Sequence, residues 1–152
     1  MEDRVQKAVE LFKSGYNCSQ SVVAAFADMY GFTQEQALRM GASFGGGIGR
    51  MRETCGAACG MFLVAGLETG ATEATDREGK AANYAVVQEL AAEFKKRNGS
   101  LICGELLGLK KKEPASNVPE ERTAQYYSKR PCAKMVEEAA RIWSEYLENH
   151  PK

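Results

Sequence analysis

The fold of this chain is decided by one stretch, which reads Gly45-Gly46-Gly47-Ile48-Gly49-Arg50-Met51-Arg52-Glu53-Thr54-Cys55-Gly56-Ala57-Ala58-Cys59-Gly60-Met61-Phe62-Leu63-Val64-Ala65-Gly66-Leu67. Its first half contains too much glycine for a helix or a strand, and its second half contains no charged residue. The Thr54 hydroxyl can accept from an unpaired first-turn amide, so we predict that Thr54 caps a helix whose first residue is Cys55. A helix without charge lacks a solvent face. We therefore predict a glycine-rich loop followed by a buried central helix over residues 55–67.

Apolar residues at helical spacing predict three further helices before this stretch. Gly15 ends the first of them. Asn17 is a good N-cap for the second, which places Cys18 at its first position. A capping box from Thr33 to Gln36 opens the third, which we expect to run to about residue 43.

The same signals predict helices to the end of the chain. A long helix starts at residues 75–78, ends at residues 98–99, and turns four apolar side chains inward: Ala82, Val86, Leu90 and Phe94. Ser100 caps a short helix that holds Cys103. Residues 110–119 are predicted to form an exposed loop. A helix that begins at Pro119 is broken by Pro131. A last helix carries Cys132 in its first turn. No segment alternates as a strand does, so we predict an all-α fold, a compact multi-helix single domain over residues 1–152.

Charge and hydropathy exclude some classes of function. The 20 basic and 20 acidic residues of the 152-residue chain cancel, which argues against a nucleic-acid partner. The longest apolar run, residues 61–67, is far shorter than the roughly 20 residues that span a bilayer, which argues against membrane insertion. Residues 1–4 do not resemble the start of a signal peptide. We expect a soluble, cytoplasmic protein.

Five cysteines in a cytoplasmic chain indicate metal or redox chemistry more than structural disulfides. Four of them share a setting, since Cys18, Cys55, Cys103 and Cys132 each fall in the first turn of a predicted helix, where unpaired amides and the helix dipole favour a thiolate. If these helix starts converge, thiolates about 6 Å apart would repel by roughly 3 kcal/mol. A metal, disulfide pairing or protonation would relieve that repulsion. The one histidine, His150, lies at the tail, which argues against Cys-His catalysis.

The fifth cysteine and the glycines have their own interpretations. Cys59 lies one turn after Cys55, where helix geometry disfavours a disulfide, so it is a resolving thiol or a core residue. A phosphate cradle is a weak alternative for the loop, because no strand precedes it and no Gly-Lys-Ser/Thr follows. We expect five glycines to approach whatever the sulfurs hold: Gly45, Gly46, Gly47, Gly49 and Gly56. Four cations that precede two of the cysteines could offset sulfur charge: Arg50, Arg52, Lys129 and Arg130.

These residues resemble the redox-active family named for its cysteine pattern, C-GCAxxG-C-C. The match comprises Asn17-Cys18, the glycine-rich residues 44–49, the Cys55–Gly60 core, Cys103 and Cys132, and it covers the chain from about Val5 to Ile142. The core reads Cys-Gly-Ala where the family's name spells Gly-Cys-Ala. The resemblance implies redox activity and a link to transporters, and it assigns Cys59 no role. A related module occurs in split-Soret cytochromes, but this chain lacks the Cys-x-x-Cys-His that attaches haem.

Our leading hypothesis is a redox protein in which Cys18, Cys55, Cys103 and Cys132 act together on an unknown redox partner. They would either ligate an iron–sulfur cluster, with zinc as the second choice of metal, or cycle between thiol and disulfide. One alternative is a non-catalytic helical protein with structural zinc or buried cysteines, and another is a small-ligand accessory of a transporter. We further expect Cys55 to be a favoured thiolate and Cys59 to be inert.

Overall fold

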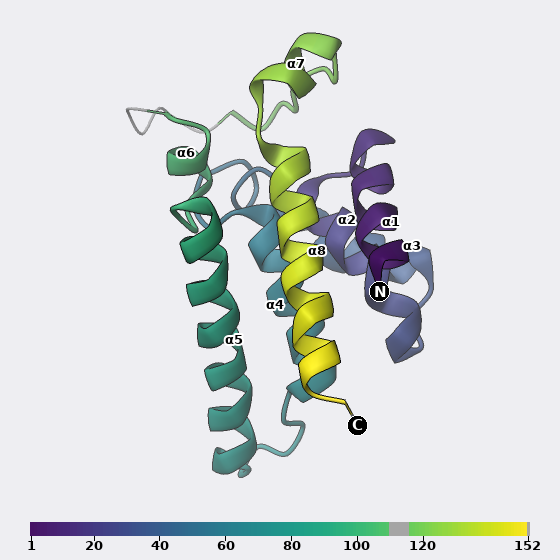
Figure 1. Ribbon diagram of the computed structural model, residues 1–152, viewed down its shortest axis with the longest axis vertical. Helices are drawn as coiled ribbons and strands as arrows, with labels where there is room; N and C mark the ends of the chain where they lie inside the picture. The colour runs from purple at the N-terminus through teal and green to yellow at the C-terminus, as the bar shows by residue number, and fades with distance from the viewer. Residues whose placement is uncertain (110–115, 152) are drawn as a thin grey trace.

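The computed structural model describes residues 1–109 and 116–151, and within them the chain is all helical, as the sequence predicts (Figure 1). The helices are α1 (Glu2–Lys13), α2 (Cys18–Phe26), η1 (Ala27–Tyr30), α3 (Gln34–Gly41), η2 (Ala42–Phe44), α4 (Gly56–Thr69), α5 (Arg77–Asn98), α6 (Cys103–Leu106), α7 (Ala124–Lys129) and α8 (Cys132–Asn149). One isolated antiparallel bridge joins Thr54 to Ile102. The first six residues of the predicted exposed loop 110–119 lie outside the described residues.

The predicted central helix is α4, which packs against α2, α5 and α8. Its first six residues are all buried. Gly60 allows the closest approach, because a Cβ at that position would lie 2.9 Å from both the Ser19 carbonyl oxygen and the Val22 Cβ of α2. The glycine therefore sets the distance between α2 and α4, and the cost of glycine within a helix is offset by this packing.

Two predicted capping residues, Asn17 and Thr33, are confirmed. Asn17 accepts from the Gln20 amide at 2.8 Å, and the Gln20 side chain accepts from the Asn17 amide. Thr33 and Gln36 make the same reciprocal pair at the start of α3. These caps fix where each helix begins, so Cys18 is the first residue of α2, as predicted.

Other predicted boundaries are wrong because contacts distant in the sequence decide them. Cys55, not Thr54, is the N-cap of α4, since Thr54 bridges to Ile102 and the Cys55 amide donates to the Leu101 carbonyl at 2.6 Å. Helix α6 is preceded by Ile102 as its N-cap rather than by Ser100. The helix predicted from Pro119 begins only after Thr123, whose hydroxyl accepts from the Tyr126 amide.

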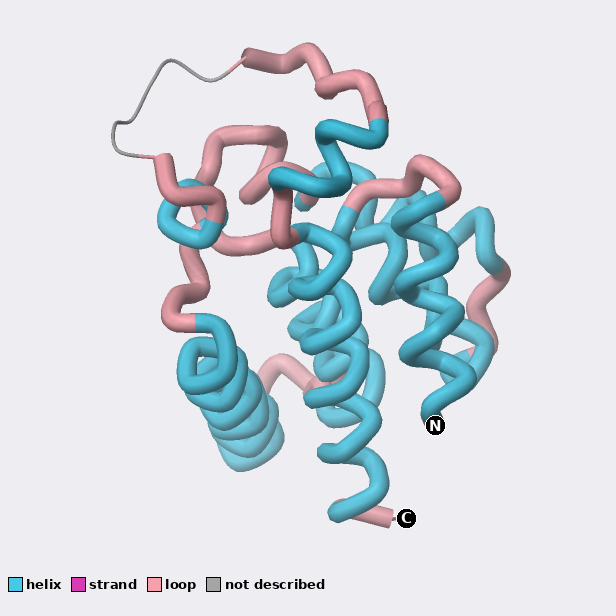
Figure 2. Tube along the Cα trace, turned by 45° about the horizontal axis from the view of Figure 1, so that its top comes forward, coloured by secondary structure: helices cyan, strands magenta, loops and turns pink. Residues whose placement is uncertain are grey.

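The interior face of α5 is confirmed only in its second half. Leu90 and Phe94 are buried and Val86 packs partly against the core, but Ala82 is exposed. The start of α5 lies at the lower end of the molecule in Figure 1, and the loops that follow it in sequence gather with α6 and α7 at the opposite end (Figures 1 and 2). Within the described residues, no helix has both the length and the apolar character that a membrane crossing needs.

Candidate functional site

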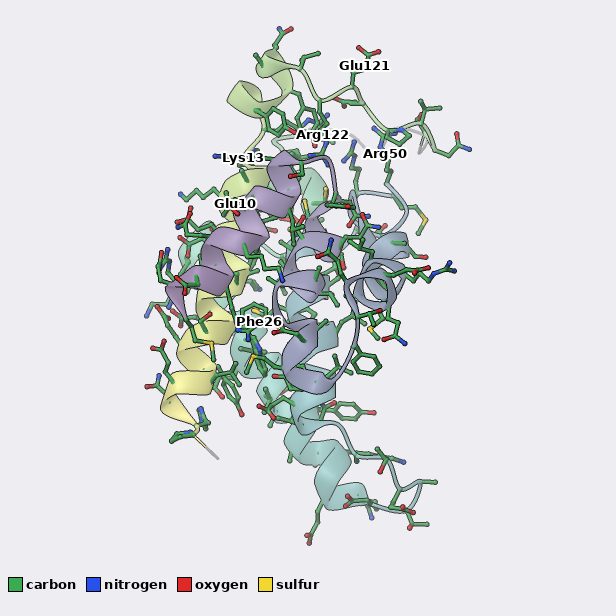
Figure 3. All side chains as sticks on the ribbon, turned by 90° about the vertical axis from the view of Figure 1, so that its right-hand side faces the viewer. Glu10, Lys13, Phe26, Arg50, Glu121 and Arg122 are labelled. Atoms are coloured by element: carbon green, nitrogen blue, oxygen red, sulfur yellow. The ribbon has the colours of Figure 1, made fainter. Side chains whose placement is uncertain are left out.

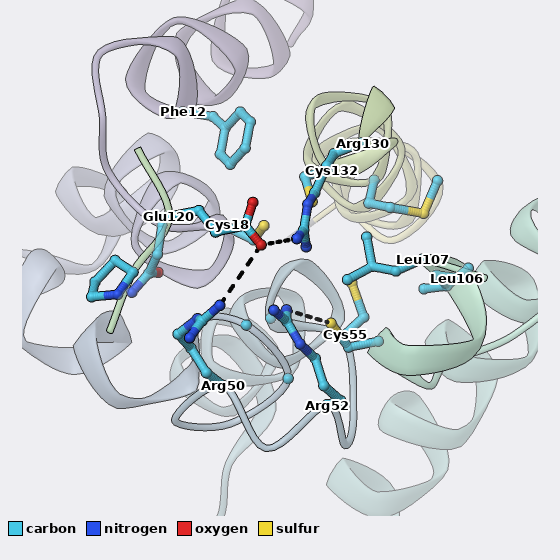
Figure 4. Close-up of a pocket in the computed structure, with 18 of the residues that line it drawn as sticks. Phe12, Cys18, Arg50, Arg52, Cys55, Leu106, Leu107, Glu120, Arg130 and Cys132 are labelled. Atoms are coloured by element: carbon cyan, nitrogen blue, oxygen red, sulfur yellow. Dashed lines mark hydrogen bonds and ion pairs between the residues drawn. The ribbon is translucent and has the colours of Figure 1, made fainter. Parts of the chain in front are cut away.

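The structure brings the four helix-start cysteines to one cavity of about 380 Å³ (Figure 4). Cys18, Cys103 and Cys132 are the first residues of α2, α6 and α8, and Cys55 is the N-cap of α4. The helices α6 and α8 begin at the same end of the molecule (Figure 1). The sequence placed these thiols in one local setting, and the packing of the helices now places them in one site.

Cys18 and Cys132 form a hydrogen-bonded pair. The Cys18 thiol donates to the Cys132 sulfur, which lowers the pKa of Cys132 to about 7. The positive charge of Arg130, a hydrogen bond from Tyr126 and the charge of Arg122 act in the same direction, against partial burial. The same hydrogen bond raises the pKa of Cys18, so negative charge in the pair resides on Cys132 rather than on Cys18.

Cys55 does not carry the favoured thiolate that we expected. It is 5% exposed, and burial raises the pKa of its thiol to about 12. The amides of Ala57 and Ala58 hydrogen-bond to the sulfur and act in the opposite direction, as a helix N-terminus should, but they are outweighed. The expectation is wrong because desolvation of a buried thiolate costs more than two amides return.

Cys103 is buried beside a cation that approaches from the glycine loop. The Arg52 Nη1 donates to the Cys103 Sγ at 3.7 Å. That contact lowers the pKa of Cys103, while burial raises it by more, so the net direction is upward. Arg52 therefore donates its hydrogen bond to Cys103 and not to Cys55, the cysteine nearest to it in the sequence.

Cys59 is separate from the other four cysteines. It is absent from the described cavity wall, and its thiol donates to the Thr54 carbonyl at 3.8 Å. Burial raises the pKa of Cys59 to about 11, the direction expected for an inert thiol.

The glycine loop makes a left-handed turn beneath the cavity. Residues 46 to 50 and Arg52 all have positive φ, including three residues with side chains, Ile48, Arg50 and Arg52, at 61° to 65°. Left-handed conformation costs such residues about 1–2 kcal/mol each. Gly47 is required for a further reason, since a Cβ there would lie 2.6 Å from the Cys103 Cβ.

The five predicted glycines all line the cavity, but the loop is built for close approach rather than for phosphate. Amides from residues 48 to 53 donate to carbonyls of residues 43 to 48. These amides are therefore not free to bind an anion, as a phosphate cradle would require. The glycines bring backbone against the thiols at Gly47 and at Gly56, where a Cβ would lie 3.3 Å from the Cys18 Cβ.

Residues 120–126, far along the chain from the glycine loop, complete the cavity. Three of them that line the cavity were not predicted from the sequence: Glu120, Arg122 and Tyr126. Glu120 contacts Arg130 and lies 3.9 Å from Arg50. Arg122 donates to the carbonyls of Phe12 and Tyr16, at the end of α1, and reaches over that end (Figure 3). Tyr126 faces Cys132. The nearest local signal is that Tyr126 lies six residues before Cys132 in the sequence. The side chain of Lys129, another predicted cation, lies outside the described residues.

A metal site needs at least three of the cysteine sulfurs, or other donor side chains, to converge on one point. Among the described residues, no group of three or more His, Cys, Asp or Glu side chains is arranged to hold a metal ion. The four thiols as placed do not fit a three- or four-thiolate site, and no step below is derived through a metal. The iron–sulfur cluster and the zinc site stay predictions from the sequence.

A family model described as "Putative redox-active protein (C_GCAxxG_C_C)" matches residues 16–146 of the chain. The matched range includes all five cysteines, the glycine loop and the segment that carries Glu120 and Arg122. Searches of curated proteins and of solved structures gave no match.

Proposed function

Because the chain belongs to the redox-active C_GCAxxG_C_C family, we propose that it is a thiol–disulfide redox protein whose working pair is Cys18 and Cys132. The observation that carries this proposal is the hydrogen bond between the two thiols at the wall of one cavity. A thiolate beside a thiol is the reduced form of a pair that can close into a disulfide. Both thiols are half-buried and line the cavity, so a small disulfide can reach them.

The two thiols have different parts in this reaction. The Cys132 thiolate attacks one sulfur of a substrate disulfide, the substrate S–S bond breaks, and one substrate thiolate leaves. Cys132 is the attacking group because its pKa of about 7 lies near neutral pH. The Cys18 thiol then gives its proton to a departing thiolate and attacks the Cys132 sulfur. The protein is left with a Cys18–Cys132 disulfide, and two electrons have passed to the substrate, which is now two thiols.

The surrounding residues support the thiolate and keep the other sulfurs out of the reaction. Arg130, Tyr126 and Arg122 favour negative charge on Cys132. Burial keeps Cys55 protonated, and Cys103 is buried against Arg52. The cavity therefore holds one reactive thiolate. This avoids the repulsion expected if all four converging cysteines were ionised.

A redox titration tests this proposal. The protein is equilibrated in buffers of reduced and oxidised dithiothreitol, and free thiols are counted after acid quenching. We expect one two-electron transition in which the five thiols of the reduced chain fall by a pair. Cys132→Ser and Cys18→Ser should each abolish the transition, and Cys59→Ala, the matched control, should retain it. A transition that persists in Cys132→Ser would refute the assignment of the pair.

A further inference from the structure

The cavity beside the thiols is strongly cationic in a chain whose net charge is zero. Among the residues that the structure describes, the charged side chains in its wall are four guanidinium groups and one carboxylate: Arg50, Arg52, Arg122, Arg130 and Glu120. A concave site lined by one sign of charge concentrates ligands of the opposite sign. A cavity of about 380 Å³ has room for a small molecule. Its charge is therefore matched to a small anion.

Arg52 and Arg122 make their contacts away from Glu120. Arg52 donates to the Cys103 sulfur, and Arg122 donates to two carbonyls at the end of α1 while its guanidinium lies 4.3 Å from the centre of the Phe12 ring. Arg50 and Arg130 are the pair that contacts a carboxylate, and Arg50 Nη1 also donates to the Ser116 carbonyl at 2.7 Å. Both are mostly enclosed, with 20% of each side chain exposed.

That carboxylate belongs to Glu120, which lies between the two guanidinium groups in Figure 4. Its side chain is 45% exposed, more than twice the exposure of its partners. Glu120 comes from residues 116–123, which precede α7, whereas Arg50 is fixed by the left-handed turn and Arg130 adjoins α8. The two cations are therefore held by the fold, and the carboxylate enters from the solvent side. Glu120 shows which chemical group the pair of guanidinium groups accepts.

We propose that this cavity binds a small disulfide that carries a carboxylate, with the carboxylate between Arg50 and Arg130 in place of Glu120. This assignment rests on the proposed function of Cys18 and Cys132. A carboxylate held by two guanidinium groups gains charge-assisted hydrogen bonds of defined direction. Arg130 precedes Cys132 by two residues, so a ligand anchored there has its disulfide sulfur near the attacking thiolate.

The test compares three small disulfides that differ in charge: 3,3′-dithiodipropionate, neutral 2-hydroxyethyl disulfide and cationic cystamine. Each rate of reaction with the fully reduced protein is divided by the rate with free 2-mercaptoethanol, which removes differences in intrinsic reactivity. We expect the anionic disulfide to be favoured over the neutral one by about tenfold, the factor that one charge-assisted contact supplies. The cationic disulfide should be the slowest.

Variants of the cation pair and of the carboxylate identify the site. Arg50→Gln should reduce the preference for the anionic disulfide towards unity, and Glu120→Gln should increase that preference, because the competing carboxylate is gone. Arg39→Gln, an exposed cation paired with Glu35, is the matched control and should leave all rates unchanged. Circular dichroism of each variant verifies that it is folded.

The two proposals fail in different ways. Equal normalised rates for all three disulfides, or a preference that Arg50→Gln and Glu120→Gln leave unchanged, would overturn the anion site while the dithiol stands. No oxidation of Cys18 and Cys132 by the neutral disulfide would overturn the proposed function itself. A preference for cystamine would overturn the charge assignment of the cavity.

Discussion

The hydrogen bond from Cys18 to Cys132 can be removed without removing the reactive sulfur. Cys18→Ala deletes the donor, and Cys18→Ser replaces the thiol by a hydroxyl that still donates. In the native protein the pKa of Cys132 is about 7 against an ordinary value of 9.0. At neutral pH a much larger fraction of Cys132 is therefore thiolate than of an ordinary cysteine.

The size of the effect follows from that contact. The Cys18 donor is the largest cause of the lowered pKa. A hydrogen bond to an ionised group contributes about 1.5–3 kcal/mol, which corresponds to about one to two pKa units. We therefore expect the pKa of Cys132 in Cys18→Ala to rise from about 7 to about 8–9. In Cys18→Ser it should stay within about half a unit of the native value, because a donor remains.

The assay is the rate at which iodoacetamide alkylates Cys132 in reduced protein from pH 5 to pH 10, followed by mass spectrometry of the Cys132 peptide. The rate rises with pH as the thiolate forms, so the midpoint reports the pKa. Cys59→Ala serves as the control for the loss of a buried thiol, with a midpoint near that of the native protein. A midpoint near 7 in Cys18→Ala would refute the reasoning. An equal shift in the alanine and serine variants would assign the effect to packing instead.

Further predictions concern packing, capping and metal. Gly60→Ala should lower the free energy of unfolding by about 1–3 kcal/mol, because its Cβ would meet α2 at 2.9 Å. Gly66→Ala, in the same helix, should raise that free energy by up to about 1 kcal/mol, because an added Cβ would have no atom within 4 Å. Urea unfolding measures both variants, and equal effects on the free energy of unfolding would contradict the close packing at Gly60. Asn17→Ala should cost about 0.5–2 kcal/mol by the same method through loss of the α2 cap, and no loss would show that the cap is dispensable. Elemental analysis of anaerobically prepared protein separates the dithiol from the iron–sulfur cluster predicted from the sequence. A working Cys18–Cys132 dithiol requires both sulfurs to be free of metal, and stoichiometric iron and sulfide would replace the dithiol with a cluster.

Local signals in the sequence were enough to place most helices and to single out the cysteines. Asn17 and Thr33 sit beside the residues that complete their capping boxes, so nothing beyond three residues is needed to predict those helix starts. The absence of charge from residue 54 to residue 67 likewise predicts a buried helix. Each of these predictions rests on residues that are neighbours in the sequence.

The rest depends on contacts that no local pattern contains. The start of α4 is decided by the Leu101 carbonyl, and the cavity is completed by Glu120 and Arg122, far along the chain from the glycine loop. The reactive thiol was also misassigned, because a helix start indicates only the favourable dipole. Burial, which separates Cys55 from Cys132, is a property of the packed helices.

The central claim is that Cys18 and Cys132 are the redox pair, and disulfide mapping tests it most directly. The native protein is oxidised by one equivalent of diamide, a two-electron thiol oxidant. Its remaining thiols are alkylated at low pH, and the digest is analysed by mass spectrometry without reduction. The account predicts one linked pair of peptides that joins Cys18 to Cys132, with Cys55, Cys59 and Cys103 alkylated. A disulfide between any other two cysteines, or alkylation of all five, would contradict it.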